Sequence, residues 1–211
     1  FQAFRAPTDN DAHSPCVLGE STWFSHGLDH LTRCCCEREI TVHKEGWGEL
    51  RNLCRYQAGA GSFQVDLRLF LYGDGRVRTD CTVTPDGKLP ELARMGLCLL
   101  ADPRYTEMDW YGRGPLETYP DRKQGGIIGA WREQIGKQFS YIRPQEFGLH
   151  QDCRSMVLAS ERESLRVEGA CTLAMSALPY SAQALWEAAH PRELPGKERI
   201  YLNIDYAHRG L

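Results

Sequence analysis

The clearest strand signal in this sequence is the stretch Phe63-Gln64-Val65-Asp66-Leu67-Arg68-Leu69-Phe70-Leu71-Tyr72. Apolar side chains occupy its odd-numbered positions, which is the period of a β-strand with one buried face. Gly73-Asp74-Gly75 follows and favours a tight hairpin turn, because Asp-Gly accommodates positive φ angles. Alternation resumes over residues 77–83. The sequence therefore predicts an antiparallel hairpin here.

The same period of two appears on both sides of this hairpin. Further strands are expected at 33–43, 49–57, 93–101, 105–111, 139–142, 150–160, 163–168, 170–178 and 198–206. Short helices are expected at 23–31 and 180–189, a loop over 1–22 and a long connection over 123–140. Strands at this spacing must hide their apolar faces by packing or closing their sheets. The pattern predicts one all-β domain over residues 1–211, a sandwich or a barrel.

Composition narrows the class of protein. The chain has 211 residues, is 42% hydrophobic and carries a net charge of −3 without a block of like charge. Nucleic acid and membrane surfaces are therefore not expected partners. No apolar run is long enough to span a bilayer. The sequence opens on Phe1, so we expect it to be a piece of something longer.

Cysteine usage favours free thiols over disulfides. There are nine cysteines, an odd number, and Cys34-Cys35-Cys36 are consecutive. This spacing is unlike a disulfide framework, so we expect buried and edge thiols in a reducing compartment. The sequence contains no Cys-x-x-Cys pair, so no structural zinc site is expected.

The middle of the chain carries the densest motif, Trp110-Tyr111-Gly112-Arg113-Gly114-Pro115-Leu116-Glu117-Thr118-Tyr119-Pro120-Asp121-Arg122. Glycines and prolines here predict a strand that ends in a stiff turn. Large rings beside charged side chains can form a binding surface, with Trp110, Tyr111 and Tyr119 stacking on a sugar or lying in an interface. The alternative is a packed corner whose charges satisfy one another.

This motif resembles a segment of the C-terminal domain of β-galactosidases of glycoside hydrolase family 2. There, an aromatic residue leads into Gly-x-Gly-Pro-x-Glu-x-Tyr-Pro-Asp-Arg. Three further segments resemble that family in the same order. They are Arg5-Ala6-Pro7-Thr8-Asp9-Asn10-Asp11, Tyr141-Ile142-Arg143-Pro144-Gln145-Glu146 and Tyr201-Leu202-Asn203-Ile204-Asp205. Four ordered matches over residues 5–205 make the resemblance specific.

The resemblance implies a large antiparallel β-sandwich of the galactose mutarotase-like type, truncated at both ends. It implies a parent enzyme, cytoplasmic in bacteria, that hydrolyses terminal β-D-galactosides such as lactose with retention. In that family the catalytic glutamates lie in a preceding (β/α)8 barrel, and Mg and Na ions are bound by other domains. We therefore expect no catalytic residue, no metal site and no cofactor in this chain.

The resemblance also implies what this chain contributes. Asp9, Asn10, Asp11 and His13 would border the sugar pocket. The expected partners are the galactoside, reached through the parent enzyme, the parent's barrel and other domains, and further copies in a homo-oligomer. The family's sugar-stacking tryptophan would lie beyond Leu211. Phe147-Gly148-Leu149-His150 stands where the family usually has Asn-Gly-x-Arg.

Other functions remain open on sequence alone. A mutarotase-like epimerase needs a histidine acid and a glutamate base, for which His150 with Glu146, or His190 with Glu187, are candidates. A stand-alone carbohydrate-binding module would use the aromatic side chains of the central motif together with Trp131. A purely structural domain is the third alternative, and fold alone cannot choose among them.

Overall fold

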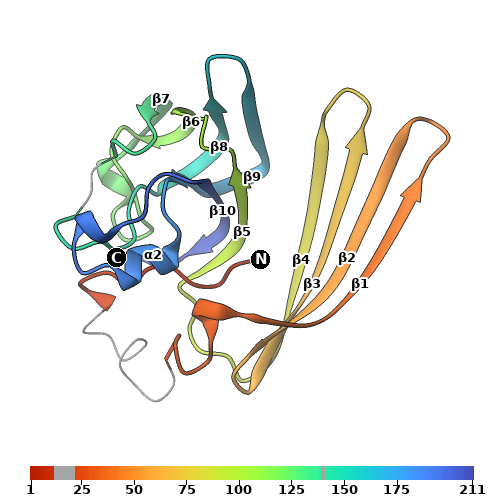
Figure 1. Cartoon of the computed structure of the whole chain (residues 1–211), viewed down its shortest axis with the longest axis horizontal. Helices are drawn as coiled ribbons and strands as arrows, with labels where there is room; N and C mark the ends of the chain where they lie inside the picture. The colour runs from red at the N-terminus through yellow and green to blue at the C-terminus, as the bar shows by residue number, and fades with distance from the viewer. Residues whose placement is uncertain (12–21, 139–140) are drawn as a thin grey trace. The chain divides into compact units, whose positions relative to one another are not determined.

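The structure, a computed structural model, describes residues 1–11, 22–138 and 141–211. The chain forms two compact units (Figure 1). One unit comprises Glu20–Glu91, and the other comprises Phe1–Gly19 together with Leu92–Leu211. The prediction of a single domain over residues 1–211 stays a prediction.

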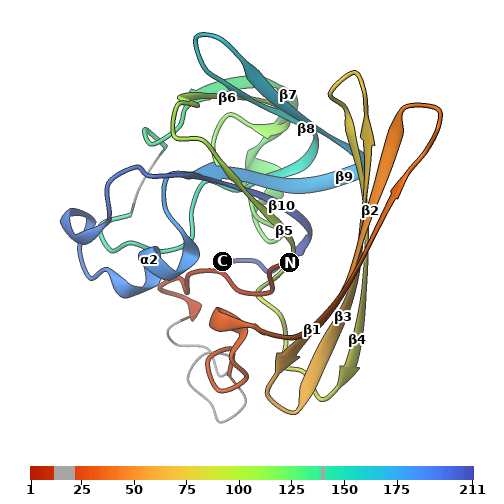
Figure 2. The ribbon, with the colours of Figure 1, turned by 45° about the vertical axis from the view of Figure 1, so that its right-hand side comes forward.

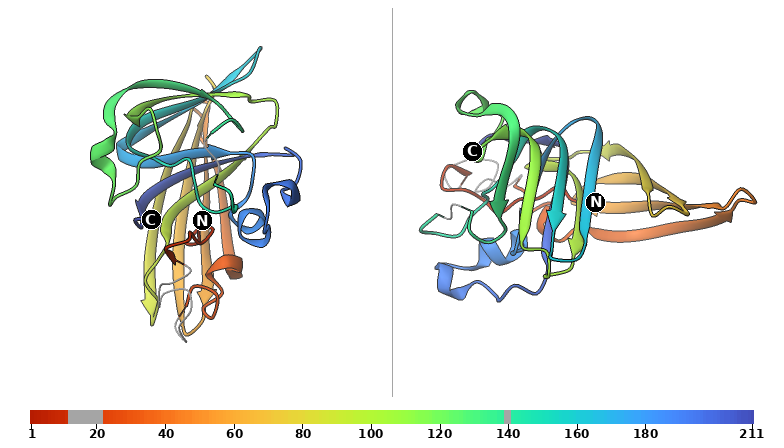
Figure 3. Two further views of the ribbon diagram at one scale, coloured as in Figure 1. Left: turned by 90° about the vertical axis from the view of Figure 1, so that its left-hand side faces the viewer. Right: turned by 90° about the horizontal axis from the view of Figure 1, so that it is seen from above.

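The first unit is an antiparallel sheet of four long strands, which lie side by side in Figure 3. Its strands are β1 (Thr32–Val42), β2 (Trp47–Ala58), β3 (Gly61–Tyr72) and β4 (Val77–Gly87), paired in that order. The predicted hairpin of residues 63–83 is therefore confirmed as β3 and β4. Leu69 pairs with Leu50 on one side and with Thr79 on the other.

The register of this sheet separates two kinds of side chain. Ile40 pairs with Leu50, which pairs with Leu69, so these apolar side chains share one face. The neighbouring row lies on the opposite face, because side chains alternate along a strand. There Arg51 donates to Asp66 at 2.9 Å. The alternation in the sequence thus places most apolar side chains on one face of the sheet and most charged side chains on the other.

The cysteine prediction was wrong for one pair. Cys36 and Cys54 lie directly opposite each other on β1 and β2 and form a disulfide, with their Cα atoms 4.1 Å apart. Sequence spacing could not show this pairing, because it arises from the register of two strands. Among the described residues, free thiols remain at Cys34, Cys35, Cys81, Cys98, Cys153 and Cys171, and Cys16 lies outside them.

The second unit holds an antiparallel sheet of six strands. They are β5 (Arg94–Ala101), β6 (Glu107–Gly114), β7 (Ile127–Gln134), β8 (His150–Ala159), β9 (Ser164–Leu178) and β10 (Ile200–His208). Their order in the sheet is β5-β10-β9-β8-β6-β7. Figure 2 shows β9 running beside β10, to which it is paired. The two antiparallel sheets confirm the predicted all-β class.

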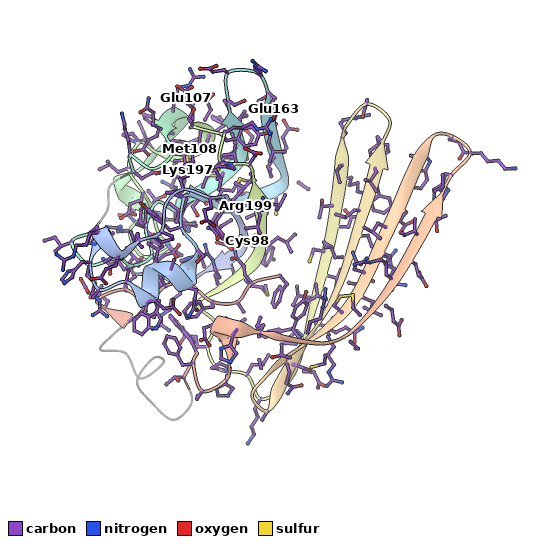
Figure 4. The ribbon with its side chains drawn as sticks, viewed as in Figure 1. Cys98, Glu107, Met108, Glu163, Lys197 and Arg199 are labelled. Atoms are coloured by element: carbon purple, nitrogen blue, oxygen red, sulfur yellow. A yellow bond between two sulfur atoms is a disulfide. The ribbon has the colours of Figure 1, made fainter. Side chains whose placement is uncertain are left out.

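The six-stranded sheet buries its apolar residues on one core. Met108, labelled in Figure 4, is fully buried there. The buried members of this core come from β5, β6, β8, β9 and β10 and from the residue just after β7: Ala101, Trp110, Ile135, Cys153, Met156, Leu158, Met175, Ala177, Ile200 and Leu202. Trp131 of β7 packs against them and is partly buried. Burial of this many large side chains is the main force that holds the unit together.

The helices given for the described part of the chain are short: the 3-10 helices η2 (Leu28–His30), η3 (Lys123–Gly125) and η4 (Pro191–Glu193), and the α-helix α2 (Ala182–Glu187). The Ser181 hydroxyl caps α2 by accepting from the Ala184 amide at 3.0 Å. Leu185 packs α2 against Ala6, Phe147 and Leu178. The expected helix at 23–31 was wrong, because Gly27 takes a left-handed conformation that breaks it.

Three strand predictions also need correction. The expected connection 123–140 contains β7, an edge strand whose residues are half-buried or exposed. The expected strands 163–168 and 170–178 are one strand, β9, which runs through Gly169. Residues 141 and 142 are not in a strand, and residues 139 and 140 lie outside the described part of the chain.

Candidate functional site

The four motif segments, far apart in sequence, meet in one buried polar cluster of the six-stranded unit. We call it the motif cluster, and its members are Arg5, Asp11, Arg94, Tyr119, Glu146, Asp205 and His208. Their side chains are at most 3% exposed. Buried charges cost free energy unless they are paired, so the pairing inside this cluster decides what it can do.

The N-terminal segment supplies the first pair. Arg5 donates to both carboxylate oxygens of Asp11, at 2.8 Å and 3.0 Å from Nη2. The same guanidinium donates to the carbonyls of Arg209 and Gly210, at 3.0 Å and 2.7 Å. One side chain thereby fastens the residues after β10 to the N-terminal segment.

The second group joins β5, β10 and the segment before β8. Arg94 donates to Asp205 at 2.7 Å and lies 3.5 Å from Glu146. Burial opposes ionisation of Glu146, but the charges of Arg94, His208 and Arg5 outweigh it and lower the pKa of Glu146 to about 2. The carboxylate is therefore ionised at neutral pH and bound within the protein.

Tyr119 of the central motif packs edge-on against His208, with ring centroids 5.5 Å apart. Burial raises the pKa of the Tyr119 hydroxyl well above its usual range. His208 Nδ1 lies 2.7 Å from the Arg209 carbonyl, and its Nε2 lies 3.6 Å from Glu146 Oε1. Among the described residues, Tyr119 Oη, Glu146 Oε1 and His208 Nε2 have no hydrogen-bond partner.

The predicted pocket-rim residues fall into two groups. Asp11 is buried and serves the ion pair, whereas Asp9 and Asn10 are exposed at the tip of a turn. The turn closes on itself: Asp11 Oδ2 accepts from the Thr8 amide at 2.9 Å, and the Thr8 hydroxyl accepts from the Asp11 amide at 3.2 Å. His13 lies outside the described residues. Asp9 and Asn10 are thus the rim candidates that the structure presents to solvent.

The central motif forms a corner whose charges are largely paired. Glu117 accepts from the Tyr141 hydroxyl and from the Gly148 amide, each at 2.6 Å, and it also pairs with Arg122. This carboxylate ties the segment 141–148 to the corner at both ends. The packed-corner alternative therefore describes this motif well.

Beside this corner lies an open hollow with a cavity volume of about 640 Å³. Arg113 and Lys123 line it, and both bind the carboxylate of Asp152, at 2.5 Å and 2.9 Å. Leu116 stands at its edge with 75% of its surface exposed. Of the other charged lining residues, Glu117 pairs with Arg122, and Asp121 accepts from the Leu211 amide.

The three aromatic candidates of the central motif lie in different environments. Trp110 is buried, stacks on His150 with centroids 3.8 Å apart, and donates from Nε1 to the Arg113 carbonyl. Tyr119 lies in the motif cluster. Tyr111 is 46% exposed, with the guanidinium of Arg154 over its ring. Tyr111 is the member of this set that could stack on an external ring.

The residues suggested for an epimerase do not suit that chemistry. His150 and Glu146 are each about 1% exposed, so neither faces a substrate. Burial lowers the pKa of His150 to about 4, which keeps its ring neutral at pH 7. Glu187 and His190 are exposed beside α2, and Glu187 accepts from Gln183 within that helix.

Sequence reasoning missed Arg94, Gln145 and His208 as parts of this site. The available signal for Arg94 was a charged residue inside the apolar stretch of β5. Gln145 and His208 lay inside or beside matched segments, but nothing local indicates that their side chains point inward. Their interaction partners are distant in sequence, so the spacing of residues could not indicate that they belong to the site.

The described residues contain neither a metal-binding cluster nor a helix that could cross a membrane. Outside residues 12–21 and 139–140, no group of three or more His, Cys, Asp or Glu side chains could hold a metal ion. The carboxylates of the motif cluster are bound to arginines instead. In the same described residues, no helix is long and apolar enough to cross a membrane.

Comparison with known proteins identifies the family. The family model described as beta galactosidase small chain matches residues 1–211. A β-galactosidase of Vibrio cholerae is 31% identical over 99% of this chain, and one of Vibrio vulnificus is also 31% identical over 99%. The β-galactosidase BgaC of Bifidobacterium adolescentis is 29% identical over 99% of the chain. The chain spans about one fifth (20%) of the length of each of these relatives. The match over the whole sequence shows that this chain belongs to the β-galactosidase small chain family.

Proposed function

We propose that this chain is the non-catalytic C-terminal domain of a β-galactosidase that hydrolyses terminal β-D-galactosides with retention. In this proposal it completes the rim of the sugar pocket and makes contacts that hold the assembly. The relatives' names support the activity of the parent, and the share of their length that the chain spans supports its role as one part.

One observation carries the rim role: Asp9 and Asn10 are exposed on a turn that buried groups hold in a fixed shape. A loop that is rigid at its base and open at its tip suits a binding edge. Both side chains offer oxygens that can accept hydrogen bonds from sugar hydroxyls.

The buried carboxylates support the absence of catalysis in this chain. A retaining glycosidase needs two carboxyls about 5 Å apart that face the scissile bond. Asp11, Glu146 and Asp205 come together, but each is buried and held by arginine or histidine side chains. Their negative charge stabilises the fold and does not meet a substrate.

We infer the remaining partners from the family. The galactoside would be bound jointly with the (β/α)8 barrel and other domains of the parent, within a homo-oligomer in the cytoplasm. Mg and Na ions would be held by those other domains. The arginine-bound carboxylates of this chain do not suit such ions.

The rim role is tested in the full-length enzyme with Asp9→Ala and Asn10→Ala. We expect each to raise KM several-fold while kcat changes less, because the lost contacts bind substrate in the ground state. Glu161→Ala, an exposed acidic residue in the turn between β8 and β9, is the control. Unchanged kinetics in both rim variants would contradict the rim role.

The location of the chemistry is tested with a chromogenic β-galactoside. The 211-residue chain is assayed alone and then mixed with the upstream part of the parent as a separate polypeptide. We expect no hydrolysis by the chain alone and activity on mixing. Hydrolysis by the chain itself would mean that a complete carboxylate pair lies within it.

A stand-alone carbohydrate-binding module is the second candidate, favoured by the exposed ring of Tyr111. Titration of the isolated chain with galactose and lactose, comparing the wild type with Tyr111→Ala, separates this candidate from the rim role. Saturable binding that Tyr111→Ala abolishes would favour the module.

A further inference from the structure

The tip of the exposed turn at Thr8–Asp11 is anchored by a residue from far along the chain. The amide of Asp9 donates to Oε1 of Gln145 at 2.8 Å. The base of the turn is held separately, by the bonds between Thr8 and Asp11 and by the ion pair of Asp11 with Arg5, and none of these bonds is made by the Asp9 amide. The contact with Gln145 fixes the direction of the Asp9 peptide, and therefore the direction in which the tip points.

The anchor is itself held rigidly. Gln145 is 5% exposed, and the next residue, Glu146, is 1% exposed and lies 3.5 Å from Arg94. Arg94 is bound in turn to Asp205 of β10. A side chain whose neighbours are locked by buried charges loses little further freedom when it makes a hydrogen bond. Gln145 is therefore a rigid hydrogen-bond acceptor that can hold the exposed turn in a fixed position relative to the sheet.

We propose that Gln145 is a positioning residue for substrate binding, which acts by holding the Asp9–Asn10 tip in its binding direction. This inference rests on the proposed function, in which the tip borders the sugar pocket. Without the acceptor, the Asp9 amide turns to water and the tip samples several directions. Substrate must then order the tip on binding, so affinity falls while the chemical step is untouched.

The test uses the full-length enzyme with Gln145→Met, which keeps the length of the side chain but removes the amide acceptor. We expect KM to rise about three- to ten-fold with kcat within about two-fold, as expected for the loss of one hydrogen bond. Hydrogen exchange in a peptide covering residues 8–11 should become faster. Gln145→Glu, which keeps an acceptor oxygen at the same reach, should stay closer to the wild type on both measurements.

Gln151→Met is the matched control, because Gln151 is a second buried glutamine, 7% exposed, whose amide nitrogen has no hydrogen-bond partner among the described residues. It should leave KM and the exchange of residues 8–11 unchanged. If Gln145→Met also leaves both unchanged, the inference is overturned.

Failure of the inference and failure of the proposed function give different patterns. If Asp9→Ala and Asn10→Ala raise KM but Gln145→Met does not, the rim role stands and Gln145 is not a positioning residue. If Gln145→Met speeds exchange at residues 8–11 while all three variants keep the wild-type KM, the proposed rim role is overturned, and the inference falls with it.

Discussion

Arg5 and Asp11 form a buried bidentate ion pair between two residues of one short segment, with Arg5 Nη2 2.8 Å from Asp11 Oδ2. Asp11 also accepts from the Thr8 amide, and Arg5 also binds two carbonyls after β10. The pair therefore shapes the exposed turn and fastens it to the end of the sheet. Removing Asp11 would leave the buried guanidinium of Arg5 without this carboxylate.

Asp11→Ala should lower the free energy of unfolding by about 3–5 kcal/mol, because it leaves a buried guanidinium without its carboxylate. Urea denaturation at pH 7 measures this change. The control is Asp9→Ala, an exposed neighbour that should change stability by less than about 0.5 kcal/mol. Equal losses in the two variants would show that the ion pair does not stabilise the fold.

Glu146 should make stability depend on pH in the acid range. The pKa of Glu146 is about 2 in the folded chain, against an ordinary value of 4.5. Between pH 4.5 and 2, Glu146 is therefore protonated in the unfolded chain but stays ionised in the folded chain. Its contribution is complete above pH 4.5, is lost as the pH falls toward 2 and amounts to at most about 3 kcal/mol.

Urea denaturation of Glu146→Gln at pH 7, 4.5 and 3 tests this contribution. The variant should be less stable than the wild type at pH 7, and its stability should fall less steeply with acid. Glu161→Gln, an exposed glutamate, should follow the wild-type curve. A Glu146→Gln curve parallel to that of the wild type would contradict the assigned pKa.

Protonation of His150 in the unfolded chain should lower the free energy of unfolding at a higher pH than protonation of Glu146 does. Its folded pKa is about 4, below the ordinary 6.5, because its ring is buried against Trp110. Above pH 6.5 the ring is neutral in both states. Between pH 6.5 and 4 only the unfolded chain binds the proton, so the free energy of unfolding falls by about 2 kcal/mol from pH 6.5 to 5.

The variant His150→Phe keeps a ring on Trp110 and cannot be protonated, so its melting temperature should change less between pH 7 and 5 than that of the wild type. His190→Phe is the control, since His190 is exposed. If the melting temperature of His150→Phe falls between pH 7 and 5 as much as that of the wild type, another group causes the loss of stability.

Two glycines of the central region provide a matched test of close packing. A Cβ atom at Gly112 would lie 2.8 Å from the Cα atom of Cys153, whereas one at Gly125 would meet nothing within 4 Å. Gly112→Ala should therefore cost about 1–3 kcal/mol through forced shifts of β6 or β8. Gly125→Ala should be nearly neutral. Thermal unfolding of both variants checks the difference, and similar losses would refute it.

Some strands were predictable because their signal is local. Alternation over Phe63–Tyr72 and the Asp-Gly turn after it indicated β3 and β4 directly. β7 was missed because none of its residues is fully buried, and its sequence Ile-Ile-Gly-Ala-Trp-Arg-Glu-Gln does not alternate between apolar and polar side chains. β9 was divided in two because Gly169 resembles a strand break. The pairing with β8 does shift register between Glu168 and Leu173, but β9 continues through it as one strand.

The sequence by itself determined the all-β class, the family and the four segments that matter. Only the tertiary structure decided that Asp11 is buried while Asp9 is exposed, that Cys36 meets Cys54, and that Gln145 anchors a turn 136 positions away. The physical reason is that periodicity and turn chemistry depend on neighbours along the chain. A buried ion pair or an anchoring hydrogen bond depends on which distant segments exclude water together.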